Sequence, residues 1–210
     1  MKLMFINGSP KAIGSASAEI LKELQSYISG HTVSECAFHA GSGIAPALID
    51  EISEQDVLVF AFPLYVDGIP SHLLRVFIEL EKELQSRPRE RVAYAVVNAG
   101  FYEGRQCANA LDMMKLWCEK AGVRWGQGLG IGGGGMLAGL TNVPAGKGPK
   151  KNSSSALAEL ADAGCERKSG DNLFVTPGFP RFLYIAGGNM GWRMQAKQNG
   201  LKIRELSVRK

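Results

Sequence analysis

The sequence predicts an α/β fold with a doubly wound parallel sheet, and two observations carry this prediction. Short apolar runs alternate with amphipathic segments over roughly the first 130 of 210 residues, which favours successive βαβ units. The apolar runs are also continuous, as is typical of strands that are buried on both faces of a parallel sheet. The predicted strands are residues 3–6, 32–38, 56–62, 91–97 and 125–131, of which "DVLVFAF" at 56–62 is the clearest.

Apolar residues at helical spacing predict a helix after the first, third and fourth strands. Gly30 and Gly122 close two of these helices, and Pro70 stands near the first turn of the other, where proline is tolerated. The three apolar stripes are Ile20, Leu21, Leu24, Tyr27 and Ile28; Leu73, Phe77, Leu80 and Leu84; and Leu111, Met114, Trp117 and Cys118.

The chain changes character after the fifth predicted strand. Residues 132–148 are rich in glycine and predict a loop, and Ser153 is placed to cap a short helix that runs to Ala163. The last apolar segment predicts a glycine-interrupted helix that packs back on the domain. We therefore expect one domain, with a core at about 1–135 and a Gly-rich loop and C-terminal helical extension at 136–210.

Composition excludes several classes of protein. Hydrophobic residues make up 45% and charged residues 21% of the chain, which argues against disorder. The net charge of +4 is too small to indicate a nucleic-acid partner. The four cysteines form no C-x-x-C pair, so no metal site is expected. No apolar run approaches the ~18 residues of a membrane span, and no signal-peptide core is present. We therefore expect no membrane association and a cytoplasmic location.

The loops after strands one, three and four are the expected ligand site, because ligands bind at the carboxyl ends of strands in open parallel sheets. The first loop, residues 7–15, offers backbone at Gly8, the hydroxyls of Ser9 and Ser15, and the amides of a helix N-terminus. These groups predict a small phosphate site, and Lys11 adds positive charge. The alternative is that serine and glycine only form a turn and a helix cap.

A literal G-x-G-x-x-G occurs at Gly130, Gly132 and Gly135. It follows the fifth strand instead of the first, so we do not interpret it as a dinucleotide fingerprint. We interpret it as a loop whose backbone passes close to something flat.

The second and third loops, residues 63–70 and 98–105, place aromatic side chains beside glycine. Tyr65 lies between two prolines, and Phe101 and Tyr102 lie between two glycines. Such loops suit the rim of a planar heteroaromatic ring, although a surface tyrosine that only covers a loop is the alternative. A ligand with a phosphate at one end and a flat ring at the other would touch all three loops, and flavin mononucleotide (FMN) fits this description.

Three segments together, "NGSPKAIGSAS", "PLYVDGIPSHL" and "VNAGFYEG", resemble the flavodoxin-like NAD(P)H-dependent FMN reductase and quinone reductase family. The resemblance implies a flavodoxin-like three-layer sandwich with a five-stranded parallel sheet in the order 2-1-3-4-5. Many family members carry arginine in the first loop, where this chain has Pro10 and Lys11. By position, the resemblance assigns the phosphate to Ser9, Lys11, Ser15, Ala16 and Ser17, the isoalloxazine edge to Pro63, Leu64, Tyr65 and Val66, and closure of the ring site to Asn98, Ala99, Gly100 and Tyr102.

The resemblance further implies an FMN-binding oxidoreductase. It would use NADPH or NADH to reduce flavin, quinone or a similar small-molecule electron acceptor by hydride transfer through FMN. The flavin carries the chemistry, so no catalytic side chain is assigned, and backbone amides at 64–66 are expected to face the reduced ring. His72, Glu103 and Asp67 are interpreted as helix or turn residues. Dimerisation is common in the resembled family, so a homodimer is one expectation.

Two other functions stay open from the sequence. One is a flavodoxin-like electron carrier with a protein partner, although such carriers are usually strongly acidic and this chain is basic. The other is a non-catalytic binding module on the same fold, in which the Gly and Ser loops are structural.

Overall fold

The computed structural model describes residues 1–41, 43–137, 139–202 and 205. The chain divides into two compact units, Met1–Gly178 and Phe179–Lys210, which are described separately.

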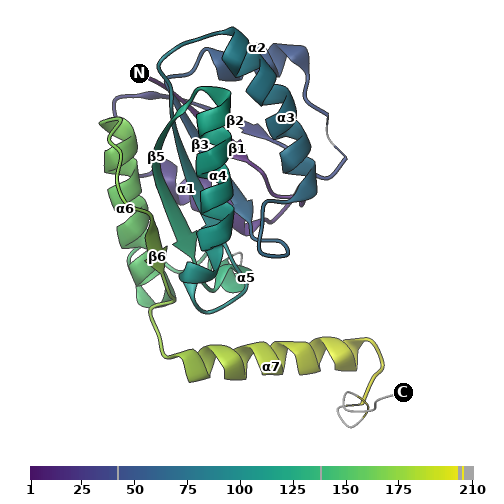
Figure 1. Ribbon diagram of the computed structural model, residues 1–210. Coiled ribbons are helices and arrows are strands. Elements are labelled where there is room, and N and C mark those ends of the chain that lie inside the picture. Colours follow the sequence, from purple (N-terminus) through teal and green to yellow (C-terminus); the bar gives the residue numbers. More distant parts are fainter. Residues whose placement is uncertain (42, 138, 203–204, 206–210) are drawn as a thin grey trace. The chain divides into compact units, whose positions relative to one another are not determined.

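The first unit is built on a six-stranded parallel sheet in the order β2-β1-β3-β4-β5-β6 (Figure 1). The first five strands follow the predicted order, but the prediction of five strands is wrong. Leu173 to Val175 form a short sixth strand that pairs with Leu129 to Ile131. The strands are β1 (Lys2–Asn7), β2 (Thr32–Ala37), β3 (Val57–Pro63), β4 (Val92–Asn98), β5 (Arg124–Ile131) and β6 (Leu173–Val175).

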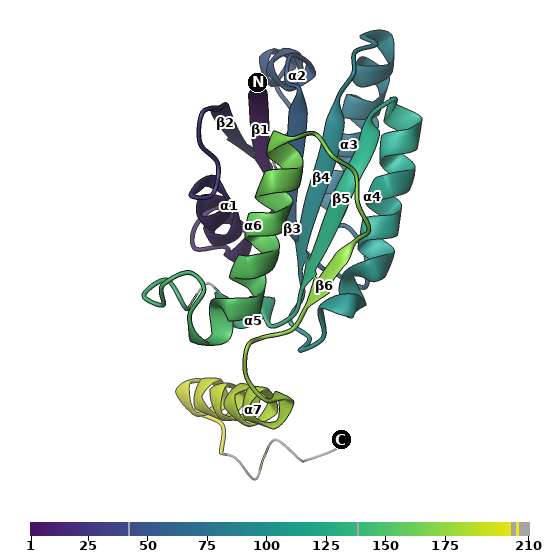
Figure 2. The ribbon, with the colours of Figure 1, turned by 90° about the vertical axis from the view of Figure 1, so that its left-hand side faces the viewer.

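Helices cover both faces of this sheet, as Figure 2 shows with α1 and α6 on one side and α3 and α4 on the other. Along β1, Leu3 and Phe5 pack in the core with α1 and α6, whereas Met4 and Ile6 pack in the core with α3 and α4. This alternation confirms the three-layer arrangement. The helices are α1 (Ala16–Gln25), α2 (Pro46–Ser53), α3 (Ser71–Ser86), α4 (Ala108–Ala121), α5 (Gly134–Leu137) and α6 (Lys151–Cys165), with 3₁₀ turns at Gly104–Cys107 and Gly148–Lys150.

Two details of the helices differ from the sequence predictions. The helix α2 was not predicted; it begins with Pro46 in its first turn, where the missing N–H of proline costs nothing. The helix α6 begins at Lys151, so Ser153 lies inside the helix instead of capping it, and its hydroxyl donates to the carbonyl of Lys150.

The second unit contains α7 (Arg181–Gln198), which runs without a break through Gly187, Gly188 and Gly191. That this segment packs on the rest of the domain stays a prediction. No helix in the described ranges is both long enough and apolar enough to cross a membrane. Among the described residues of this unit, the exposed large apolar ones are Phe182, Leu183, Ile185, Met190, Trp192, Met194 and Leu201.

Tyr94 on β4 fixes the connection between β5 and β6 to the sheet. Its ring is fully buried, and its hydroxyl lies 2.8 Å from the carbonyl oxygen of Ala163 and 2.6 Å from that of Lys168, to which it donates. Gly126 on the neighbouring strand makes room for the ring, because a Cβ there would lie 2.6 Å from it. Burial raises the pKa of Tyr94 to about 12, so the hydroxyl keeps its proton at neutral pH.

We expect the substitution Tyr94→Phe to lower the free energy of unfolding by about 1–3 kcal/mol, because the carbonyl oxygens of Ala163 in α6 and of Lys168 beyond it lose the hydroxyl hydrogen that they share. Urea denaturation measures this change directly. A variant that unfolds at the same urea concentration as the original protein would contradict the structural role of the hydroxyl.

Candidate functional site

The three predicted site loops lie at one edge of the sheet, where the carboxyl ends of β1, β3 and β4 meet (Figure 1). Backbone hydrogen bonds continue the strand pairing into these loops. The amide of Gly8 donates to the carbonyl of Ala61 at 2.8 Å, that of Leu64 to Asn98 at 2.8 Å, and that of Ala99 to Ile131 at 2.8 Å. The loops therefore start from fixed positions relative to one another.

The first loop is folded by short-range side-chain contacts. The amide of Ser9 donates to Asn7 Oδ1 at 3.0 Å, and the amide of Lys11 donates to Ser9 Oγ at 3.3 Å. Each of these hydrogen bonds closes a turn of a kind that Asn and Ser commonly form. His39 Nδ1 lies 2.9 Å from the carbonyl oxygen of Ser9 and ties the loop to the segment after β2. Ser9 is therefore buried and engaged, whereas Lys11 is exposed.

The N-terminus of α1 has the donors that a phosphate needs. Ser15 is the N-cap, and its Oγ accepts from the amide of Ala18 at 3.2 Å. The amides of Ala16 and Ser17 occupy the first two helical positions, where the helix itself offers no acceptor. These amides, the positive end of the helix dipole and the exposed Lys11 form a donor set that fits the phosphate of FMN.

The side chains of Ser17 and Asn98 have partners within the protein. Asn98 Nδ2 donates to Ser17 Oγ at 3.0 Å and to the carbonyl of Phe62 at 3.1 Å. Both side chains are buried. They join the first turn of α1 to the ends of β3 and β4, so they position the site. The Ser17 hydroxyl accepts in this contact and keeps its own hydrogen to donate, so its assignment to a phosphate stays a prediction.

Gly8 has a packing role that differs from its sequence interpretation. A Cβ at this position would lie 2.5 Å from Leu73 Cδ2 and 3.2 Å from Phe62 Cβ. The glycine therefore lets α3 pack closely on the end of β1, and the residue is buried.

The second loop is a two-residue turn. Tyr65 and Gly68 exchange backbone hydrogen bonds of 3.1 and 3.0 Å, and both residues between them, Val66 and Asp67, have positive φ. The carbonyl of Asp67 accepts from Asn109 Nδ2 at 2.8 Å, which anchors the turn to α4. The amides of residues 64 and 65 thus donate within the protein, and that the stretch 64–66 faces a flavin ring stays a prediction.

The third loop is held by the Gly-rich segment after β5. The amide of Gly133 donates to the carbonyl of Phe101 at 2.6 Å, and that of Gly134 to Ala99 at 2.7 Å. A Cβ at Gly132 would lie 2.0 Å from the carbonyl oxygen of Tyr102. The flat object that the glycine motif passes is therefore the backbone of the third loop. Phe101 itself is half-exposed.

His72 and Cys107 are buried in the first unit, and Cys36 is partly buried. His72 is buried, with Nε2 3.0 Å from the carbonyl oxygen of Phe38. Burial raises the pKa of Cys36 and of Cys107 to about 12, which keeps both thiols protonated and unreactive at neutral pH. Within the described residues, no group of His, Cys, Asp and Glu side chains is arranged to hold a metal ion.

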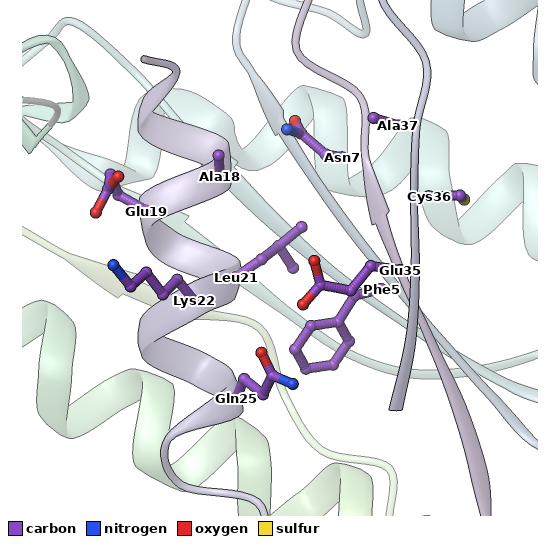
Figure 3. Close-up of a pocket in the computed structure, with 10 residues that line it drawn as sticks. All are labelled: Phe5, Asn7, Ala18, Glu19, Leu21, Lys22, Gln25, Glu35, Cys36 and Ala37. Carbon is purple, nitrogen blue, oxygen red and sulfur yellow. The ribbon is translucent and has the colours of Figure 1, made fainter. Parts of the chain in front are cut away.

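A separate groove of about 480 Å³ lies between α1 and the edge strand β2 (Figure 3). Its apolar floor includes Phe5 and Leu21, and its rim carries charges of both signs, including Lys22 and Glu35. The groove shares Asn7, the first residue of the first loop, with the candidate site. Its lining does not include Ala16 and Ser17, whose amides begin α1.

Sequence reasoning missed four residues that shape the site: Asn7, His39, Asn109 and Gly134. Asn7 carried a usable signal, because Asn followed by Gly and Ser is a common turn former. The other three act from segments distant in sequence, and nothing in their local sequence marks the loops that they hold.

We expect Gly132→Ala to destabilise the protein by about 1–3 kcal/mol, because the added Cβ would collide with the backbone of the third loop. Gly135→Ala is the matched control, since nothing lies within 4 Å of a Cβ there. Thermal or urea unfolding of both variants gives the comparison, and equal stability of the two would contradict the packing role of the motif.

No sequence-family model matches the chain, and no curated protein matches its sequence. Similar solved structures are an NADPH-quinone reductase from P. pentosaceus (12% identity, 77% of this chain and 98% of that chain, TM-score 0.55), a flavodoxin from Streptococcus pneumonia TIGR4 (12%, 79% and 99%, 0.51) and a WrbA-like flavodoxin from Agrobacterium tumefaciens (15%, 78% and 98%, 0.50). At this identity the likeness concerns architecture. The chain has the flavodoxin-like fold.

Proposed function

We propose that the protein is an FMN-dependent oxidoreductase that uses NADPH or NADH to reduce flavin, a quinone or a similar small electron acceptor. The observation that carries the proposal is the donor set at the start of α1, the amides of Ala16 and Ser17 with Lys11, at the same sheet edge as two loops that present aromatic side chains. The fold shared with flavodoxins and with an NADPH-quinone reductase supports it.

The phosphate end of the ligand would be held mainly by backbone. The Ser15 hydroxyl accepts from the amide of Ala18 and still has its own hydrogen to donate. Charge-assisted hydrogen bonds from this hydroxyl and from the two helical amides would fix the phosphate, and the ammonium group of Lys11, which belongs to the same loop, would add attraction.

The ring end would be bounded by the second and third loops. Tyr65 is half-exposed and Phe101 is half-exposed, so both have apolar surface to offer to a flat ring. Gly100 is a place where a ring can approach the chain closely, since a Cβ there would meet nothing within 4 Å. When bound, FMN would supply the hydride-transfer chemistry, and the task of the protein is to bind and orient it.

The first test is the visible absorption spectrum of the purified protein, followed by addition of FMN and then of NADPH without oxygen. Flavin bands that bleach on addition of NADPH, with turnover when a quinone is added, would support the reductase. Flavin that binds but is not reduced by NADPH or NADH would favour the electron carrier, and a protein that ignores FMN would favour the non-catalytic binding module. The cytoplasmic location stays a prediction from the sequence.

We expect Ser15→Gly to weaken FMN binding by about 1–3 kcal/mol through loss of a charge-assisted hydrogen bond. Glycine is an acceptable N-cap, so stability should fall by only a few tenths of a kcal/mol. A fluorescence titration with FMN measures the affinity. Ser26→Ala, at the opposite end of α1, is the control and should bind FMN normally. Equal affinity of all three proteins would remove this helix terminus as the phosphate site.

We also propose a homodimer in which α7 takes part. Several large apolar side chains of α7 are exposed, and exposed apolar patches commonly mark an interaction surface. Light scattering should give twice the mass of one chain, and Trp192→Glu should shift the protein towards the monomer. Leu116→Glu, at an exposed position on α4, should leave the dimer intact. A monomeric original protein, or a dimer that Trp192→Glu leaves unchanged, would contradict the proposal.

A further inference from the structure

Val66 adopts a backbone conformation that disfavours its side chain. Its φ is +48°, in the left-handed region, where a β-branched residue is an outlier. A two-residue turn with positive φ at both central positions ordinarily takes Asn, Asp or Gly. Asp67, at φ +57°, suits the second central position, but valine does not suit the first.

The surrounding structure imposes this conformation on Val66. The paired hydrogen bonds between Tyr65 and Gly68 close the turn, and Asn109 Nδ2 holds the carbonyl of Asp67 from α4. On the other side, the buried Ile69 leads directly into α3. A strained residue persists only where its neighbours hold it in place, and such residues cluster at sites of function.

No packing within the protein compensates this strain, because the Val66 side chain is fully exposed. Val66 is one of several exposed apolar side chains on the site loops. In the described part of the first unit, six large apolar side chains are exposed, and four of them lie on the three site loops: Ile13, Tyr65, Val66 and Phe101. The loops follow β1, β3 and β4, which are neighbours in the sheet, so these four side chains belong to the same carboxyl edge, and we name them the apolar rim.

We propose that Val66 is a specificity-determining contact for the electron acceptor, and that the apolar rim selects a planar, uncharged acceptor of the quinone class over a small hydrophilic one. This inference rests on the proposed function. The reaction balances with NAD(P)H as the reductant. NAD(P)H gives up a hydride, which is two electrons and one proton, and becomes NAD(P)⁺. The quinone receives this hydride equivalent and one further proton from solvent, and becomes the hydroquinone.

The test compares Val66→Asn with Val66→Ile. Asparagine suits the turn but removes the apolar surface, whereas isoleucine keeps both the branched shape and the apolar surface. The first readout is the melting temperature without FMN, and the second is the selectivity, defined as the ratio of kcat/KM for 1,4-naphthoquinone to that for ferricyanide with NADPH as reductant. Leu116→Asn, which removes an exposed apolar side chain from α4, is the matched control.

We expect Val66→Asn to raise the melting temperature by about 2–4 °C through relief of strain and to lower the selectivity about tenfold through loss of apolar contact. Val66→Ile and Leu116→Asn should keep the original selectivity. A more stable Val66→Asn with unchanged selectivity overturns the inference, as does an equal loss of selectivity in all three variants. If the original protein oxidises NADPH with neither acceptor, the proposed function itself fails, and this is known before any variant is compared.

Discussion

The carboxyl edge of the sheet depends on one buried residue at the end of β4, Asn98. Its side-chain amide donates to Ser17 Oγ in the first turn of α1 and to the carbonyl of Phe62 at the end of β3. The backbone carbonyl of Asn98 accepts from the amide of Leu64. A buried polar group is costly unless its hydrogen bonds are satisfied. Asn98 meets this requirement by joining the structures that carry all three candidate loops, and it thereby sets the position of the start of α1.

This arrangement separates the polar groups that build the site from those that remain for a ligand. The hydroxyl of Ser17, the amides of Leu64 and Tyr65 and the carbonyl of Phe101 all have partners within the protein. The amides of Ala16 and Ser17, the charge of Lys11 and an apolar rim are left at the edge. A ligand that is anionic at one end and flat at the other complements this combination better than a uniformly polar ligand does.

The central part of the fold was predictable because its physical signal is local. Strands β1, β3 and β4 are continuous apolar runs with buried side chains on both faces, and α1, α3 and α4 carry clear apolar stripes. The strand β6 has three half-buried residues, and it is placed by pairing with β5 and by packing of its side chains against residues distant in sequence. Too little local signal exists in three residues to distinguish such a strand from a loop.

The candidate site was predictable in its location and less so in its details. Gly and Ser mark loops and helix caps, so the first loop and the Ser15 cap could be located. The partner of each polar group depends on tertiary contacts, which is why the side chain of Asn98 turned out to face α1 and Gly8 to face Leu73. The glycines after β5 likewise serve the third loop, a relationship that becomes visible only when the two segments are adjacent.

The most direct measurement of the central claim is an amide-resolved NMR titration of the ¹⁵N-labelled protein with FMN. The account predicts that the largest shifts occur at the amides of Lys11, Ala16 and Ser17, with further shifts around Gly100. Shifts confined to the groove beside β2, at Lys22 and Glu35, would place the ligand elsewhere and contradict the account. The absence of any shift at saturating FMN would contradict it as well.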